Sequence, residues 1–184
     1  METNATAPEK RPIGRTYGLI TGLVMIVFTT LLYLAGVQSF IGGIAYLGYA
    51  IMIGLAAAAA LAQKKAGGGY LEFMEALKVC FTVFVIALIA QTLFSWLLLN
   101  VIDPHFKVVL KEAVIKKMQE VYTRFGIPPE KIDQAIADER TRDHYSLKEM
   151  SMGFAFSCIV HFVIALVIAA IVKKKKVEFS DAGF

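Results

Sequence analysis

The chain has 184 residues, of which 57% are hydrophobic and only 18% are charged, and its formal net charge is +4. A soluble domain is usually about 45–50% apolar and about 25% charged. Because the apolar excess is concentrated in four long runs, the composition excludes an ordinary soluble enzyme. In chain order, these runs are Tyr17–Gly36, Ile41–Ala62, Leu77–Ile102 and Met150–Val172.

Each run is long enough to cross a membrane, whose hydrocarbon core of about 30 Å requires about 20 helical residues. The runs contain no Asp or Glu, and their only basic residue is Lys78. We therefore expect an all-α integral membrane four-helix bundle, with spans at 17–36, 41–62, 77–102 and 150–172. The connection between the third and fourth spans, 103–149, is expected to form an extramembrane helical hairpin.

The basic residues predict the orientation of the bundle. The tails 1–16 and 173–184, together with segment 64–78, carry ten of the 19 basic residues. The first connection carries none, and segment 103–149 carries nine that are mixed with nine acidic residues. The positive-inside rule then places both termini in the cytoplasm (N-in, C-in) and segment 103–149 in the periplasm.

Small residues recur at four-residue spacing in the first two spans. They are Gly14, Gly18 and Gly22 in the first span and Ala50, Gly54 and Ala58 in the second. Membrane helices approach closely where side chains are small. We expect these faces to pack within the bundle, because the short first connection makes the two helices neighbours. The alternative is that the same faces join two chains.

Four residues match helix-start signals. Asp103 followed by Pro104 is typical of an N-cap and a first-turn proline. Ser146 and Glu149 have the spacing of a capping box at the start of the fourth span. Segment 70–76 follows three glycines and places its apolar residues on one face, which predicts a short interfacial helix.

The hairpin is predicted to contain two helices. The first has an apolar stripe at helical spacing, formed by Phe106, Leu110, Val114, Met118, Val121 and Phe125. The second runs roughly from Pro129 to His144 and is more polar. Because such a hairpin is too small to hold a core of its own, we expect it to pack on itself, on the bundle rim or on a partner.

These features resemble one family. The resemblance rests on the glycine-led first span, on Gly67–Gly69 followed by Tyr70-Leu-Glu-Phe73 and Glu75-Ala-Leu-Lys78, on Asn100-Val-Ile-Asp103-Pro104-His-Phe106, and on the terminal lysines Lys173–Lys176. The chain is similar, from about Gly14 to Lys176, to the bacterial four-span membrane family catalogued as domain of unknown function 4199. The resemblance implies an inner-membrane protein of a Gram-negative bacterium, and it implies no activity, substrate or cofactor.

Two polar residues lie near the middle of the spans. Gln91 in the third span and His161 in the fourth lie at similar depth, because the two helices are antiparallel. We expect them to form a hydrogen-bonded pair worth about 0.6–2 kcal/mol, with the imidazole neutral. The alternative is that His161 relays a proton or gates a cavity. The lack of a carboxylate in the spans favours the structural role.

A second polar cluster lies at the outer end of the third span. Asn100, Asp103 and His105, with Asp143 and His144, could approach a metal ion, but helix capping and solvated charge explain all five without one. No basic stripe interleaved with aromatic residues indicates nucleic-acid binding. We therefore expect no metal, cofactor, catalytic residue or nucleic-acid partner.

We expect a multi-pass protein of the bacterial inner membrane that is not an enzyme. In the lipid bilayer it would act as a scaffold, an assembly factor or a subunit of a homo-oligomer or larger complex, presenting the hairpin to its partner. The alternative is a small transporter or channel with a polar path at Gln91 and His161. A water-filled cavity reaching His161 would favour transport, whereas a packed bundle with an exposed apolar hairpin face would favour the scaffold.

Overall fold

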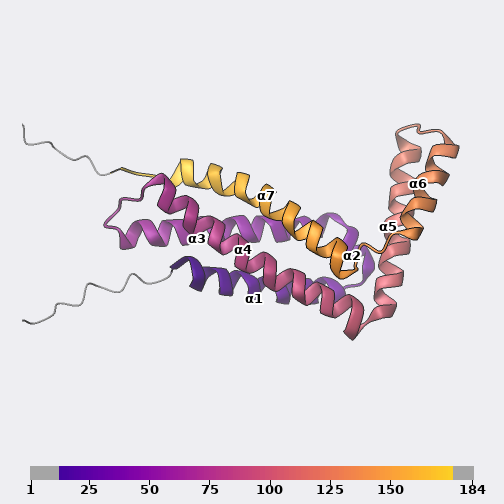
Figure 1. The fold of residues 1–184 in the computed structure, drawn as a ribbon, viewed down its shortest axis with the longest axis horizontal. Helices are drawn as coiled ribbons and strands as arrows, with labels where there is room; N and C mark the ends of the chain where they lie inside the picture. Colours follow the sequence, from indigo (N-terminus) through magenta and orange to yellow (C-terminus); the bar gives the residue numbers. More distant parts are fainter. Residues whose placement is uncertain (1–12, 176–184) are drawn as a thin grey trace, which may run out of the picture.

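The computed structural model describes residues 13–175, and it is built of helices (Figure 1). In chain order these are α1 (Ile13–Leu34), α2 (Val37–Ile41), the 3₁₀ turn η1 (Gly43–Tyr46), α3 (Leu47–Ala66), α4 (Phe73–Leu97), the π-helical turn η2 (Leu98–Ile102), α5 (Pro104–Arg124), α6 (Pro129–Thr141) and α7 (Leu147–Val172). Over the described residues, the predicted all-α fold is confirmed. The tails predicted at 1–16 and 173–184 lie largely outside these residues.

Four helical segments are long and apolar enough to cross a membrane. They are Ile13–Leu34, Gly43–Ala66, Phe73–Ile102 and Leu147–Val172, and they indicate a multi-pass membrane protein. Figure 1 shows these segments side by side as an elongated bundle. The helix α4 packs against α1, α3 and α7, so the third span forms the centre of the bundle.

The second span begins later than the sequence indicates. Residues 37–41, which join the first two runs, form the separate helix α2, and the chain then turns at Gly42 before η1 and α3. Gly42 is extended, with φ −83° and ψ 175°, so it interrupts the helical backbone. The short connection therefore contains a helical turn of its own, which lies against α5.

Residues 70–76 do not form the predicted interfacial helix. Leu71 is buried and extended, and it pairs with Lys174 through two backbone hydrogen bonds, from Leu71 N to Lys174 O at 2.9 Å and from Lys174 N to Leu71 O at 2.8 Å. The helix α4 starts at Phe73. The pairing with Lys174 satisfies the backbone N–H and C=O groups of Leu71, which would otherwise have needed partners within a separate helix.

The glycine face of α1 packs against α4. A Cβ atom built on Gly18 would lie 2.9 Å from Cβ of Ile86, and one built on Gly22 would lie 2.9 Å from Cβ of Ala90. Real Cβ atoms do not approach so closely, so these glycines allow the two backbones to come together. Gly14 continues this face, next to Thr82 and the carbonyl of Val79.

The small-residue face predicted for the second span does not pack within the bundle. Ala50 and Gly54 are exposed, and Ala58 is only half-buried. The buried face of α3 is formed instead by Gly48, Met52, Ala56, Ala59 and Ala60. The run 56–60 consists entirely of alanine, so small residues are present all around this part of the helix and their spacing does not identify the buried side.

The helices α5 and α6 form an arm at one end of the bundle, and the arm lies crosswise to the bundle axis in Figure 1. The helix α5 contacts α2 and η2 as well as α6, and Lys117 in its second half donates to the carbonyl of Ile41. Leu110 and Ile115 of α5 and Ile132 of α6 are the buried residues of the arm. We refer to residues 104–141 as the arm.

We predict that Gly18→Leu lowers the stability of the bundle. The leucine side chain would collide with Ile86 and separate α1 from α4, at a cost of about 1–3 kcal/mol. Gly54→Leu is the matched control, because a Cβ atom there would meet no atom within 4 Å. The midpoint of thermal unfolding in detergent should fall for Gly18→Leu only. Equal midpoints for the two variants would contradict the α1–α4 contact.

Candidate functional site

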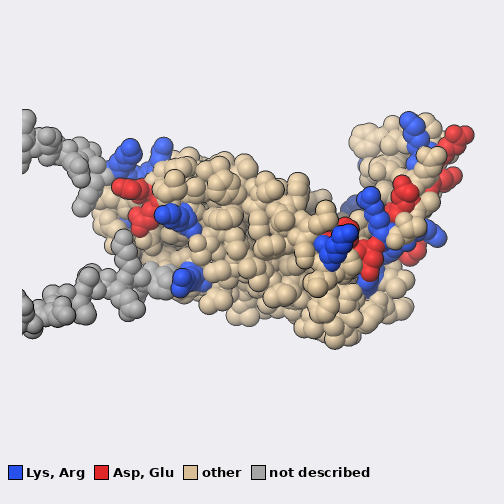
Figure 2. All heavy atoms as spheres, viewed as in Figure 1, with Lys and Arg blue, Asp and Glu red and all other residues tan. Residues whose placement is uncertain are grey.

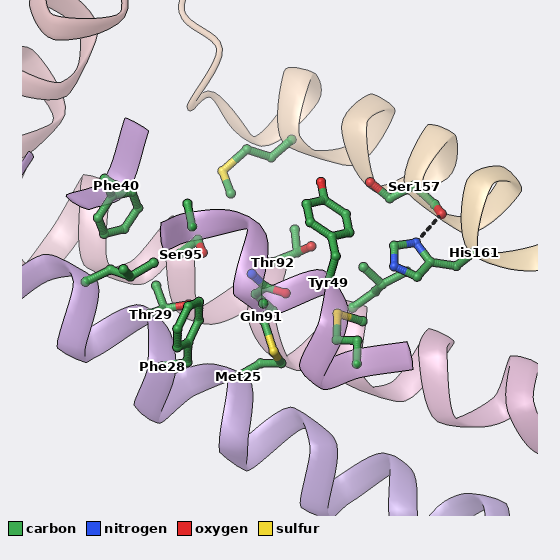
Figure 3. Close-up of a pocket in the computed structure, with 16 residues that line it drawn as sticks. Met25, Phe28, Thr29, Phe40, Tyr49, Gln91, Thr92, Ser95, Ser157 and His161 are labelled. Carbon is green, nitrogen blue, oxygen red and sulfur yellow. Dashed lines mark hydrogen bonds between the residues drawn. The ribbon is translucent and has the colours of Figure 1, made fainter. Parts of the chain in front are cut away.

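The half of the bundle nearer the arm, which we call the arm half, contains a pocket of about 310 Å³ (Figure 3). Residues of α1, α3, α4 and α7, together with α2 and η1, contribute to it, so it lies between the spans. The lining residues are Met25, Phe28, Thr29, Leu32, Phe40, Ala45, Gly48, Tyr49, Met52, Leu88, Gln91, Thr92, Ser95, Met150, Ser157 and His161. None of them is Asp, Glu, Lys or Arg, so the pocket combines apolar walls with uncharged polar groups.

His161 forms the deep end of this pocket and is 2% exposed. Its Nδ1 atom lies 2.8 Å from the backbone oxygen of Ser157, one turn earlier on α7 (Figure 3). The imidazole ring packs edge-on against Phe84, at 4.9 Å between centroids, and nearly parallel to Tyr49 at 6.1 Å. Its Nε2 atom is buried and has no hydrogen-bond partner among the described residues.

Gln91 and His161 do not form the predicted hydrogen-bonded pair. Both line the pocket, but the side chain of α4 that packs on His161 is Phe84. Gln91 lies seven residues further along α4, which corresponds to about 10 Å of helix. Depth estimated from the ends of the spans is too coarse to identify the facing residue. The hydrogen bond that does form joins His161 to the backbone oxygen of Ser157. The i, i+4 spacing of these two residues on one helix is the sequence signal that could have predicted it.

The other half of the bundle is closely packed. Beyond His161, towards the α3–α4 turn, the core is formed by small or tightly enclosed residues with no exposed surface. They include Ala56, Ala59, Ala60, Ala76, Cys80, Val83, Phe84, Ala165 and Ala169. The Sγ atom of Cys80 donates to the carbonyl of Ala56 at 3.6 Å. None of these residues lines the pocket, so in the described structure the pocket does not extend past His161 into this half.

Asp103 joins the arm to the first span. Its Oδ1 atom accepts from the backbone N–H of Phe106 at 2.9 Å, which caps α5, and Pro104 occupies the first turn. Its Oδ2 atom accepts from the hydroxyl of Tyr33 at 2.9 Å. The Phe106 ring packs edge-on against Tyr33 and against Phe40, a lining residue of the pocket. Both hydrogen bonds favour the carboxylate, so they lower the pKa of Asp103.

Lys107, near the start of the arm, binds the chain segment that follows the arm. Its ammonium group donates to Asp143 Oδ2 at 2.8 Å and to Asn100 Oδ1 at 3.1 Å. Asn100 in turn donates to the backbone oxygens of Trp96 and Tyr145, both at 3.0 Å. The Lys107 bond is the main cause that lowers the pKa of Asp143. These bonds hold the start of α5 and the chain before α7 against η2.

The fourth span starts at the residue expected to cap it. Ser146 Oγ accepts from the backbone N–H of Glu149 at 3.3 Å. The reciprocal half of the capping box does not form, because the N–H of Ser146 donates to the carbonyl of Asp143 at 3.0 Å. Glu149 therefore contributes its backbone and its position in the first turn of α7, where a negative charge is favourable.

The remaining part of the arm exposes apolar side chains. Val108 and Val121 of α5 are exposed, and Phe125, which follows its last residue, is 78% exposed. Figure 2 shows the charged side chains of the arm mainly on the side away from the bundle, with an uncharged region on the bundle-facing side of its free end. The predicted stripe is thus only partly buried: Leu110 lies in the arm core, whereas Val121 and Phe125 do not.

The polar cluster considered for a metal ion is distributed over separate contacts. Asp103 caps α5, Asn100 and Asp143 bind Lys107, and His144 lies 2.9 Å from Glu139. Among the described residues, no three His, Cys, Asp or Glu side chains lie close enough to hold a metal ion.

We predict that acid weakens the attachment of the arm through Asp143. An unfolded aspartate has a pKa of about 3.9, and the folded pKa is lower, so the stabilisation is present above about pH 3.9 and is lost as the pH falls through the folded pKa. Because the pair is partly exposed, it contributes less than about 1 kcal/mol.

The variant Asp143→Asn should lower the thermal midpoint slightly at pH 7. Its further loss between pH 7 and pH 3 should be smaller than that of the unchanged protein. Thermal unfolding of both proteins in detergent at the two pH values measures this difference. An identical pH dependence would show that the Lys107–Asp143 bond contributes nothing.

The comparisons with known proteins identify a family. The family model described as "Protein of unknown function (DUF4199)" matches residues 16–174. No curated protein and no solved structure matches the chain. The family match extends over the four apolar helices and the arm, with the exception of the first residues of α1. The chain therefore belongs to the DUF4199 family.

Proposed function

We propose that this chain is a protein of the bacterial inner membrane, with both termini in the cytoplasm and the arm in the periplasm. The basic residues Lys64, Lys65, Lys173 and Lys174 support this orientation, because they lie at the end of the bundle away from the arm. Lys176, the last residue of the lysine cluster, lies outside the described residues. The positive-inside rule assigns the end with these short basic segments to the cytoplasm.

Alkaline-phosphatase fusions test this topology. A fusion after Phe125 should be active, because the enzyme folds only in the periplasm, and a fusion after Lys176 should be inactive. Both fusion proteins must be detected at similar levels for the comparison to count. The reverse pattern of activity would contradict the proposed orientation.

We further propose that the protein is not an enzyme and acts as a membrane-anchored scaffold, assembly factor or complex subunit. The observation that carries this proposal is a firmly attached arm with an exposed apolar end. Asp103, Phe106 and Lys107 fasten the arm to the bundle, while Phe125 remains largely in solvent. Val121, four residues before Phe125, is also exposed, and contiguous exposed apolar residues are the kind of surface that binds a partner.

A small transporter or channel is the second candidate, and the pocket at Gln91 and His161 favours it. An open channel requires a continuous path through both halves of the bundle, whereas a transporter opens each half in turn. The closely packed residues beyond His161, such as Val83 and Ala165, leave no continuous path in the described structure, which argues against an open channel. We place the scaffold first because the apolar end of the arm is exposed.

Site-specific photo-crosslinking at Phe125 tests the scaffold function. A photoreactive phenylalanine analogue at this position should yield a protein adduct in living cells. The same analogue at Asp133, an exposed residue of α6, is the matched control and should not yield the adduct. The mass of the adduct distinguishes a second copy of this chain from another protein. Adducts to phospholipid alone at Phe125 would contradict the proposal and indicate that the arm rests on the membrane.

A further inference from the structure

We propose that the pocket binds one neutral, hydroxyl-bearing amphiphile from the membrane. Its hydroxyl group donates a hydrogen bond to Nε2 of His161, and its hydrocarbon part lies in an adjoining groove between α4 and α7. This inference goes beyond the scaffold function, because it concerns the bundle and does not depend on what the arm binds.

The tautomer of His161 determines which hydrogen-bonding group fits. The backbone oxygen of Ser157 can only accept, so the Nδ1 atom 2.8 Å away must carry the proton. In a neutral imidazole the Nε2 atom then has a free lone pair and is an acceptor. A buried acceptor without a partner is costly, so the site favours a ligand that brings an O–H or N–H donor. Nε2 has almost no accessible surface in the described structure, so a neighbouring side chain must shift when the donor reaches it.

The lining of the pocket selects an uncharged ligand with a small polar head. No charged side chain lines it, so a charged head would be desolvated without compensation. Gln91, Thr92 and Ser95 offer further hydrogen-bonding groups along one wall, opposite apolar and aromatic side chains. A volume of about 310 Å³ is at the lower end of the range for small-molecule sites, which suits a head group with part of its chain.

The adjoining groove explains why an amphiphile fits better than a water-soluble molecule. It has a volume of about 190 Å³ and lies on the surface of α4 and α7. Thr92 and Met150 line both the groove and the pocket, so the two spaces adjoin at these side chains. The other residues of the groove are Ile89, Leu93, Trp96, Leu147, Ser151 and Phe154. The groove is thus predominantly apolar, and it lies within the membrane-spanning part of the chain.

Trp96 is the only tryptophan of the chain and lies in this groove, so it reports on occupancy. Bromine quenches indole fluorescence on contact. We would titrate the full-length protein, in a detergent without hydroxyl groups, with bromoalkanols of increasing chain length and with the methyl ether of each. The alcohols should quench Trp96 with at least about tenfold higher apparent affinity than the ethers, because only the alcohols can donate to Nε2.

A matched pair of variants locates the interaction. His161→Phe removes Nε2 while keeping a planar ring beside Phe84, and it should abolish the preference for alcohol over ether. Ser157→Ala is the control and should keep the preference, because only the backbone oxygen of Ser157 bonds to His161. The comparison of alcohol with ether in the unchanged protein needs no variant, so it stands even if His161→Phe does not fold.

Several outcomes would overturn the proposal. Equal quenching by alcohol and ether would mean that the groove takes up any apolar chain and that the pocket holds only water. Equal affinities would also result if Nε2 of His161 were a donor, because alcohol and ether oxygens both accept hydrogen bonds. An unchanged preference in His161→Phe would place the alcohol elsewhere.

A competition experiment then distinguishes two kinds of membrane molecule that could supply the hydroxyl group. A short-chain diacylglycerol and a short-chain reduced isoprenoid quinone both carry hydroxyl groups on an apolar body. Relief of Trp96 quenching by one of them supports the proposal and identifies the source, whereas relief by neither would overturn the assignment to a membrane amphiphile.

Discussion

The close approach of α1 to α4 is the constraint on which the rest of the bundle depends. Within a membrane, burying apolar side chains against one another gains little over lipid, so helices associate through close van der Waals contact. Gly18 and Gly22 allow the backbone of α1 to lie directly on Ile86 and Ala90 of α4. With α1 held in this way, α4 occupies the centre of the bundle and presents its other sides to α3 and α7.

The sizes of the side chains then divide the bundle into two halves. In the half away from the arm, Val83 and Phe84 have no exposed surface in a core that contains alanines of α3 and α7, and the backbone pairing of Leu71 with Lys174 joins that end to the end of α7. In the half nearer the arm, α3 lines the pocket with Gly48, Tyr49 and Met52. The pocket borders this core, with His161 at the boundary between the two halves.

The sequence was informative where the signal is local. Hydropathy located four spans, and the identities of Asp103, Pro104 and Ser146 located helix starts, because a cap depends on residues within one turn. It failed for contacts between helices. The alanine run of α3 contains small residues on every side, and a pairing of Gln91 with His161 required a register between α4 and α7 known to within one turn. Helix rotation and register come from the packing of all four spans, which no single segment encodes.

The pocket and the arm are joined by one short stretch of structure. The chain widens into the π-helical turn η2 at the end of α4, where Asp103 N donates to the carbonyl of Leu98 at 2.8 Å. An extra residue in the turn redirects the chain, so that α5 departs crosswise from the bundle. Phe106 at the start of α5 then meets Phe40, which is also part of the pocket wall. The first turn of the arm and the arm-side rim of the pocket thus share the same aromatic contact.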